Sequence, residues 1–413
     1  MLDHLINVNS EIGKLKVVMV HRPGKEIENF TPEMMHRILF DETPDLWIAQ
    51  KEHDYFAKVL KDHGTKVLYI EQLAAQSLTS PEIKNRFLER MLNESGYPKG
   101  TVHDALKAYL FPMASQKMIN TIIAGVRKTD VDLKPVKHSF DDAEHVGYPF
   151  YMDPMPNLYF TRDTSACIGN GLSINRMTFP VRRRESLFND LIIKHHPLFK
   201  SQHIPLWRTR NHYHTHIEGG DEEVLNNHVM AIGISQRTSI GAIKGIALRL
   251  FKHSHFDTIL TVLIPHNHAL MHLDTVFTMI NYDQFTVYPG ILKNNAISTW
   301  TITPDGKGGL HYQYDDNLKR ALKRVLHLDE IDLIMTGNGD PIVAPREQWN
   351  DGTNTLAIAP GVVVTYDRNY VSNLILEKHG LNVITIPSSE LSRGRGGPRC
   401  MSCPIYREDL KQQ

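Results

Sequence analysis

The stretch Glu218-Gly-Gly-Asp221, followed by the run Val229-Met-Ala-Ile-Gly-Ile234, shows the pattern that decides the fold. A polar, acidic turn leads into a run that is almost wholly apolar, as expected for a buried strand. Further copies of this arrangement are Thr161-Arg-Asp163 before 165–168, His272-Leu-Asp274 before 276–280, and Asn350-Asp-Gly352 before 355–366. Their spacing is irregular, so they predict a degenerate repeat of strand-containing units. The alternative is that Asp and Gly simply separate strands here, as in many proteins.

The segment before these repeats predicts a βαβ-like start. Strands are expected over 16–20 and 66–70, with a helix over 45–63 between them. Apolar residues from Trp47 to Leu60 recur at helical spacing, and Gly64 ends the helix.

The character of the chain changes between residues 73 and 146. Helical patterns cover 81–93, 102–109 and 116–126, strand-like runs are absent, and the polar segment 128–145 leads back. We therefore expect an α/β domain formed by residues 1–72 and 147–413, with an all-helical insertion over 73–146.

Composition narrows the class of partner. Lys plus Arg and Asp plus Glu both number 46 among 413 residues, so the formal net charge is zero. Proteins that bind nucleic acids or membrane surfaces generally carry an excess of basic charge, so neither is expected as a partner of this chain. A small molecule is the expected partner.

No signal peptide or run of apolar residues long enough to span a membrane is apparent. Three cysteines in so long a chain indicate a reducing compartment, and we expect a cytoplasmic protein.

Cys400 is the residue most strongly marked for chemistry. It follows Arg393-Gly-Arg-Gly-Gly-Pro-Arg399, where glycines allow backbone to approach a ligand and arginines favour a thiolate. This flanking sequence is unlike that of a core strand, so a nucleophile is favoured over a buried structural cysteine. With Cys403 it also forms a Cys-x-x-Cys pair. A zinc site would need a second such pair, and a thioredoxin-like redox motif would stand at the start of a helix, but the sequence shows neither feature. A single Arg-Gly-Gly-like segment without interleaved aromatic residues does not predict nucleic-acid binding.

The histidines offer two alternatives. His212, His214 and His216 would share one face of a strand, and His266 and His268 form a second cluster, so a metal site is conceivable although no zinc signature appears. On a strand, His272 and Asp274 would point to the same side and supply a base and a carboxylate.

Taken together, these features resemble the arginine deiminase family of the guanidine-modifying (pentein) superfamily. The resemblance runs nearly end to end and rests on seven blocks, which are Gly13–Lys16 with His21–Gly24, Asp153–Asp163, Ile217–Asp221, Gly233–Thr238, Met271–Thr278, Arg346–Gly352 and Arg393–Cys400. It implies a five-fold pseudo-symmetric α/β propeller with a helical insertion, no metal or other cofactor, free L-arginine as substrate, and a homodimer or homotetramer.

The resemblance also implies roles for five residues in the reaction. Cys400 would attack the guanidinium carbon and His272 would act as general acid and base. Asp163 and Asp274 would hold the guanidinium, and Glu218 would orient His272. We further expect the bound guanidinium to help ionise Cys400, because its charge lies beside the sulfur.

Six further positions are implied to bind the rest of the substrate. Asn157, Arg182 and Arg237 would hold its α-carboxylate end, and Phe160 would pack on its aliphatic stem. Gly394 and Arg395 would belong to a loop that closes over it. Arg182 and Arg237 would then reject agmatine, which lacks the carboxylate, because two buried charges would be left unpaired.

Other readings stay open at this point. A related guanidine-modifying enzyme, such as an agmatine deiminase or an amidinotransferase, would use the same thiouronium chemistry. A zinc hydrolase would depend on the histidine clusters, and a non-catalytic protein would bind arginine without releasing ammonia. Cys403 stands where methionine is common in the family, so we expect it to pack as a small apolar group, with a Cys400–Cys403 disulfide on oxidation as the alternative.

Overall fold

The computed structural model describes residues 5–131, 133, 147–212, 214–292 and 297–410. Most of the strands in these residues belong to five units of the same design. In each unit two strands pair antiparallel, a helix follows, and a third strand pairs parallel to the second. The first three units are β5 (Ser165–Ile168), β6 (Gly171–Ile174), α8 (Ser186–His195) and β7 (Leu206–Arg208); β8 (Glu222–Val224), β9 (Val229–Ile234), α9 (Ile240–His253) and β10 (Thr258–Leu263); and β11 (Phe277–Met279), β12 (Gln284–Val287), α10 (Leu318–Leu326) and β15 (Asp332–Met335). The fourth consists of β16 (Leu356–Ala359), β17 (Val362–Tyr366), α12 (Tyr370–Lys378) and β18 (Asn382–Ile386).

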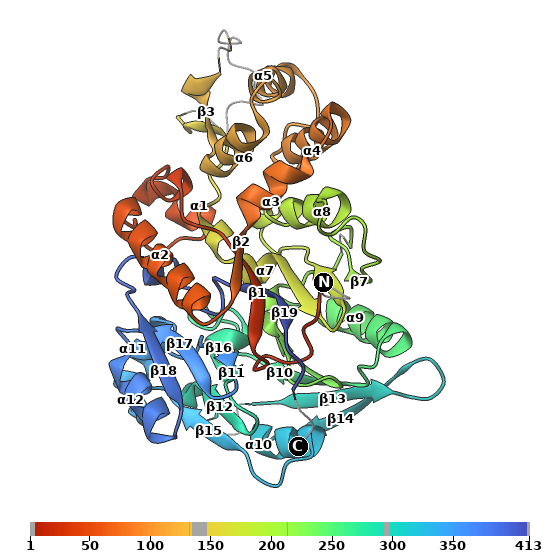
Figure 1. Cartoon of the computed structure of the whole chain (residues 1–413), viewed down its shortest axis with the longest axis vertical. Helices are drawn as coiled ribbons and strands as arrows, with labels where there is room; N and C mark the ends of the chain where they lie inside the picture. Colours follow the sequence, from red (N-terminus) through yellow and green to blue (C-terminus); the bar gives the residue numbers. More distant parts are fainter. Residues whose placement is uncertain (1–4, 132, 134–146, 213, 293–296, 411–413) are drawn as a thin grey trace.

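The fifth unit joins the two ends of the chain. Its first strand is β19 (Cys403–Arg407), which pairs antiparallel with β1 (Leu15–Val20), and α2 (Leu46–Asp62) then leads to β2 (Lys66–Tyr69), parallel to β1. Figure 1 shows β1 and β19 side by side near the centre of the molecule. The chain therefore begins and ends within one sheet.

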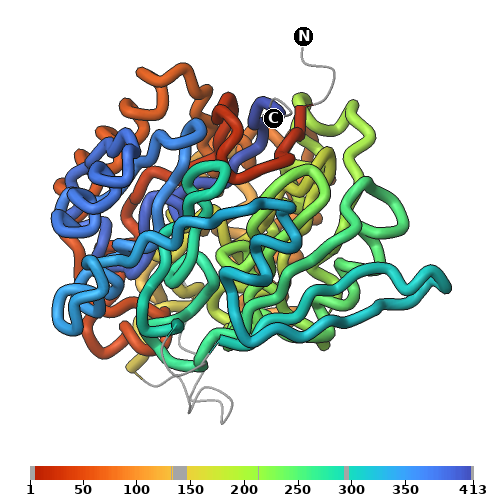
Figure 2. Tube along the Cα trace, turned by 90° about the horizontal axis from the view of Figure 1, so that it is seen from below, coloured from red at the N-terminus to blue at the C-terminus, as the bar shows by residue number. Residues whose placement is uncertain are grey.

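One hairpin departs from the repeated design. Strands β13 (Thr299–Pro304) and β14 (Leu310–Asp315) lie in the sequence between β12 and α10, yet they extend the sheet of the second unit through β10. The hairpin projects from the side of the molecule (Figure 2). This insertion explains part of the irregular spacing between the repeated turns.

The helical part lies beside the first unit (Figure 1) and contains α3 (Ile70–Ser77), α4 (Pro81–Glu94), α5 (Thr101–Leu110) and α6 (Ser115–Ala124). The three helices expected here are present, and α4 starts as expected, with Pro81 in its first turn and Ser80 as the N-cap. Two details differ from expectation. Helix α3 begins at Ile70, inside the predicted strand, and the short β3 (Val126–Arg127) pairs with β4 (Phe150–Met152). Most of the connecting segment 128–145 lies outside the described residues.

Burial explains which sequence patterns were informative. The helical part shares an apolar cluster with the first unit, in which Phe87 of α4 lies 5.7 Å from Phe188 of α8 between ring centroids. Helix α2 begins after Asp45, whose carboxylate caps Ile48, and it buries Phe56 and Leu60. Trp47, expected on the buried face, is 66% exposed and lies against Lys51 instead.

None of the described helices is long and apolar enough to span a bilayer.

Each repeated turn leads into the first strand of a unit. The strands expected after three of the turns are present as β5, β11 and β16. After the Glu218 turn the expected strand is β9, but the short strand β8 comes before it. The run 355–366 is a hairpin, β16 and β17, and not one strand. His272 and Asp274 do not share a strand, because residues Leu273–Thr275 form a 3-10 turn that starts after His272.

Candidate active site

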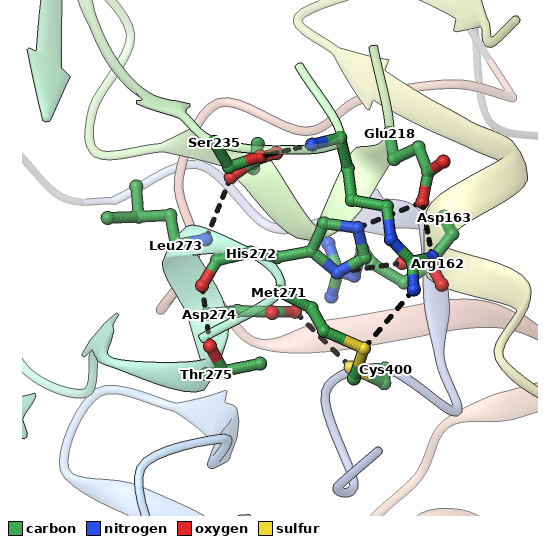
Figure 3. A network of polar contacts seen from close by, with 12 residues as sticks. Arg162, Asp163, Glu218, Ser235, Met271, His272, Leu273, Asp274, Thr275 and Cys400 are labelled. Carbon is green, nitrogen blue, oxygen red and sulfur yellow. Dashed lines mark hydrogen bonds and ion pairs between the residues drawn. The ribbon is translucent and has the colours of Figure 1, made fainter. Parts of the chain in front are cut away.

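One cavity of about 800 Å³ collects most of the predicted site residues. Its lining includes Asn157, Phe160, Asp163, Arg182, Arg237, His272, Gly394, Arg395 and Cys400. Glu218 and Asp274, which complete the predicted set, are fully buried and contact His272 and Cys400 respectively. Figure 3 shows these contacts around His272.

The repeated design explains why residues so far apart in sequence meet. Asp163 lies just before β5, Glu218 before β8, Asp274 before β11 and Cys400 before β19. Each unit therefore presents the turn that precedes its first strand to a common centre. Placement at the ends of buried strands fixes these side chains on rigid backbone.

The Cys400 thiol is buried among polar groups. Its sulfur donates to Asp274 Oδ2 at 3.5 Å and accepts from Asn354 Nδ2 at 3.1 Å. Burial raises the pKa of Cys400 well above its ordinary value, and the negative charges of Asp274 and Asp163 raise it further. Without a ligand, the thiol is therefore held in its protonated form.

The expectation that neighbouring arginines favour a thiolate is supported for Arg399 but not for Arg393 and Arg395. Arg393 pairs with Glu390 and Glu42, and Arg395 with Asp41. The charge of Arg399 lowers the pKa of Cys400, but Arg399 is shared between Glu11 and Asp274. The basic segment is thus neutralised by carboxylates from elsewhere in the chain.

His272 lies between two carboxylates (Figure 3). Its Nε2 is 2.9 Å from Glu218 Oε2, and its Nδ1 is 3.8 Å from Asp163 Oδ1. Burial by itself would lower the pKa of His272, but the charge of Asp163 and the hydrogen bond with Glu218 outweigh it and raise the pKa to about 9. His272 is therefore a cation near neutral pH, ready to donate a proton.

Replacing Glu218 with glutamine is expected to lower the pKa of His272. The variant loses a negative charge that raises the pKa of His272, so the protonated form is lost at lower pH. If turnover requires that form, the alkaline limb of kcat against pH moves to lower pH in E218Q. A limb that stays in place would show that Glu218 does not set the protonation of His272.

Asp163 and Asp274 each leave one oxygen unused. Asp163 Oδ2 accepts from Arg182 at 2.8 Å, and Asp274 Oδ2 accepts from Arg399 at 2.9 Å. The Oδ1 atoms of both residues are buried and lack a hydrogen-bond donor among the described residues. Two buried, unsatisfied acceptors beside a thiol suit a planar ligand with several N–H groups, such as a guanidinium.

The two arginines predicted to bind the α-carboxylate are not equivalent. Arg182 is saturated, because Glu185 accepts from its Nε and Nη2 while Asp163 accepts from its Nη1. Arg237 pairs with Glu218 at 3.2 Å, but its buried Nε has no partner in the described part of the chain. The premise that both charges would stay unpaired without a carboxylate ligand is therefore wrong.

The remaining predicted residues shape the walls. The Asn157 amide nitrogen already donates to the Ile38 carbonyl at 2.7 Å. Arg395, in a left-handed conformation, lies 3.4 Å from the centroid of the Trp349 ring. A Cβ on Gly394 would lie 1.9 Å from Tyr159 Oη, so the loop packs closely on the cavity wall.

Gly220 has a role that sequence alone only hinted at. An added Cβ would lie 2.6 Å from His272 Nδ1, so G220A is expected to displace the imidazole. A shift of about 1 Å in a reacting group can cost about 10²-fold in rate, and we expect a loss of that order in kcat. G245A is the matched control, because Gly245 lies in α9 with no atom within 4 Å of an added Cβ. Equal kcat in the two variants would contradict the close packing of Gly220 on His272.

In the described part of the chain, the two histidine clusters are not brought together as a group with metal-ligand spacing. His212 and His214 are exposed outside any strand, and His266 and His268 lie in an exposed loop, where His268 pairs with Asp41. Among the described residues, the one group with metal-ligand spacing is Asp163, Glu218 and His272. Arg182 and Arg237 contact its two carboxylates, which disfavours a further cation there.

Cys403 belongs to different surroundings from Cys400. Its sulfur lies 3.5 Å from the Ser165 carbonyl and interacts with Cys167, and these two cysteines share an apolar cluster that excludes Cys400. All three cysteines are free thiols. Cys403 therefore fills a packed position behind the site, next to Cys167.

Sequence reasoning did not single out Glu11 or Asn354, which help to hold the site together, and it did not predict the carboxylate partners of Arg399. Glu11 accepts from Arg399 through both carboxylate oxygens, at 3.1 and 3.2 Å, and Arg399 in turn holds Asp274. Asn354 contacts Cys400 directly. Asn354 could have been noticed from its position beside the Asn350 turn, whereas nothing local marks Glu11.

Comparison with known proteins defines the class first. An amidinotransferase of saxitoxin biosynthesis from Microseira wollei has a similar fold, with a TM-score of 0.54 at 14% identity over 99% of both chains. A dimethylarginine dimethylaminohydrolase from Pseudomonas aeruginosa gives a TM-score of 0.52 at 12% identity over 94% of this chain and 99% of that one. The fold is therefore the mixed α/β fold of the guanidine-modifying, or pentein, proteins.

The sequence comparisons then identify the family. A profile described as arginine deiminase matches residues 36–407. The arginine deiminase of Lentilactobacillus hilgardii is 66% identical over 98% of this chain and 97% of its own length, and that of Levilactobacillus brevis is 62% identical over 98% and 99%. The chain belongs to the arginine deiminase family, whose members are hydrolases of C–N bonds in linear amidines.

Proposed function

We propose that this chain hydrolyses free L-arginine to L-citrulline and ammonia, with Cys400 as the nucleophile. The observation that carries the assignment is the pair of unsatisfied oxygens, Asp163 Oδ1 and Asp274 Oδ1, beside the Cys400 sulfur. Two carboxylates that accept N–H bonds from a guanidinium would hold its carbon within reach of the sulfur.

The first half of the reaction uses the cationic state of His272. The bound guanidinium places a positive charge beside Cys400 and so favours transfer of the thiol proton to water, which returns it to the sulfur once citrulline has left. The thiolate forms a bond to the guanidinium carbon, His272 gives its proton to one nitrogen, and that C–N bond breaks to release ammonia. Cys400 then carries a cationic S-alkylthiouronium, and His272 is neutral.

The second half returns every group to its starting state. Neutral His272 removes a proton from water, and the hydroxide forms a bond to the thiouronium carbon. Collapse of this adduct breaks the C–S bond, restores the thiolate and gives citrulline, while the hydroxyl proton goes to the released ammonia. Glu218, hydrogen-bonded to His272 Nε2, would keep the Nδ1 side of the ring facing the reacting atoms.

Arg237, more than Arg182, is proposed to recognise the α-carboxylate, because its buried Nε is the donor left free. R237A is expected to lower the preference for arginine over agmatine about 10²-fold, mainly by raising KM for arginine. Measuring kcat/KM for both substrates checks this. An unchanged ratio would assign carboxylate recognition elsewhere.

Phe160 and Asn157 line the same cavity and are proposed to contact the aliphatic stem and the α-amino end of arginine. Gly394 and Arg395 are proposed to belong to the loop that closes over the bound substrate. Neither a metal ion nor an organic cofactor is required by this chemistry.

The overall arrangement is proposed to be a five-bladed propeller formed by 1–72 and 147–413, with 73–146 as a helical insertion. Pairing of β1 with β19 supports this, since it joins the chain ends as a ring of units would. We also propose a cytoplasmic homodimer or homotetramer that binds neither nucleic acid nor membrane. Light scattering of the purified protein determines the oligomeric state.

A direct assay tests the activity. Purified protein incubated with L-arginine is expected to release citrulline and ammonia in equal amounts, with no loss of activity to a chelator. Ornithine in place of citrulline would indicate an amidinotransferase, and binding without ammonia release would indicate a non-catalytic protein. Loss of activity to chelation would favour the zinc hydrolase.

A further inference from the structure

Four of the five units contribute a residue to the site from the turn that precedes their first strand, and the fourth unit has no assigned residue. Asp163, Glu218, Asp274 and Cys400 come from the first, second, third and fifth units. In the fourth unit the equivalent position, just before β16, is Asn354. Asn354 therefore occupies the position of a site residue although it has no role in the proposed reaction.

Asn354 contacts the nucleophile at two points. Its Nδ2 donates to the Cys400 sulfur at 3.1 Å, and its Oδ1 accepts from the Cys400 backbone N–H at 3.0 Å. The same Nδ2 donates to the Asp274 carbonyl at 3.2 Å. Asn354 is completely buried, so water does not compete for these contacts.

The orientation of the amide is fixed by its neighbours. A backbone N–H can face only the amide oxygen, and a backbone carbonyl can face only the amide nitrogen. With Cys400 N–H on one side and the Asp274 carbonyl on the other, the N–H group must point at the sulfur. A flipped amide would lose both backbone hydrogen bonds.

The loop that carries Asn354 is rigid. A network of buried threonines joins it to the third unit, since Thr278 donates to the Thr353 carbonyl at 2.9 Å and contacts Thr355 Oγ1 at 2.8 Å. On the other side Gly397 leaves no space, because an added Cβ would lie 2.6 Å from the Asn354 carbonyl. The amide is therefore held in place before substrate arrives.

We propose that Asn354 is a positioning residue that stabilises the Cys400 thiolate by donating a hydrogen bond to it. An N–H group interacts weakly with a neutral thiol and much more strongly with an anionic sulfur. The sulfur otherwise faces the carboxylates of Asp274 and Asp163, which oppose ionisation. Asn354 thus offsets part of their repulsion without adding a charge that would compete with the substrate guanidinium.

The proposal rests on the proposed role of Cys400, but it predicts thiol chemistry that can be measured without turnover. In N354A, inactivation by iodoacetamide at pH 8 is expected to be about five- to fifteen-fold slower, with its pH midpoint moved upward. N354D, of the same shape, would place a carboxylate against the sulfur and slow the reaction further. In both variants kcat should fall while KM for arginine changes little, because Asn354 does not line the cavity.

The matched control is N369A. Asn369 is also buried and donates to the Asn350 carbonyl at 2.7 Å on the same loop, without contacting Cys400. It should leave thiol reactivity unchanged, and thermal unfolding reports whether each variant is folded. If N354A does not fold, the isosteric N354D carries the test.

Two outcomes would overturn the proposal. In the first, N354A and N354D fold but keep the wild-type pH midpoint of iodoacetamide inactivation. In the second, N369A shifts that midpoint as much as the two Asn354 variants do. Failure of the proposed function looks different. In that case the wild type makes no citrulline, or makes it without Cys400, while the Asn354 variants still alter thiol reactivity.

Discussion

C400S is expected to reduce citrulline formation by at least about 10⁴-fold while L-arginine still binds. A serine hydroxyl ionises far less readily than a thiol, and the site offers it no suitable base. His272 is held as a cation by Asp163 and Glu218, and the nearest carboxylate, Asp274, is paired with Arg399. Citrulline assays measure the loss, and isothermal titration measures the retained binding.

The control for this variant is C403S. Cys403 lies behind the site with Cys167 and does not line the cavity, so its replacement should leave most activity intact. If C400S retained activity near that of C403S, the nucleophile would have to be another residue.

D274N is expected to change substrate turnover and thiol reactivity in opposite directions. Loss of the carboxylate removes one of the two groups proposed to hold the guanidinium, so kcat/KM should fall about 10³-fold. After burial, the charge of Asp274 is the largest contribution that raises the pKa of Cys400, so its removal lowers that pKa. At a fixed pH near 8, more thiolate is then present, and alkylation by iodoacetamide becomes faster.

D315N is the matched control for D274N. Asp315 is likewise a buried aspartate paired with arginines, Arg320 and Arg324, but it lies on β14 away from the cavity. Both kcat/KM and the alkylation rate should stay near wild type. Slower alkylation in D274N would contradict the view that this carboxylate holds the thiol protonated in the free protein.

The sequence predicted the repeated units well because buried strands and their acidic turns are local features. The strands β5 and β9 and the helix α4 follow directly from apolar runs, an N-cap and a proline. The His272 segment was misread because alternation over three residues does not distinguish a strand from a 3-10 turn. Even so, the residues around Asp274 reach the cavity, because each unit places the turn before its first strand, and not the strand itself, at the site.

The charge state of the site could not be predicted from sequence, because it depends on contacts between distant segments. Arg399 appeared to activate Cys400, yet Glu11, nearly four hundred residues earlier, shares it. Arg182 appeared free to bind a carboxylate, but Glu185 and Asp163 saturate it. Asn354 was likewise overlooked, since an isolated asparagine near a turn carries no local sign of contact with a thiol.

A covalent bond between Cys400 and the substrate carbon is the central step of the proposed reaction. Acid quenching during turnover of L-arginine, followed by mass spectrometry of the digested protein, tests this directly. We predict a mass increase equal to arginine minus ammonia on the peptide that carries Cys400, which disappears when the substrate is exhausted. Citrulline formation without any such adduct, or an adduct on a different residue, would contradict it.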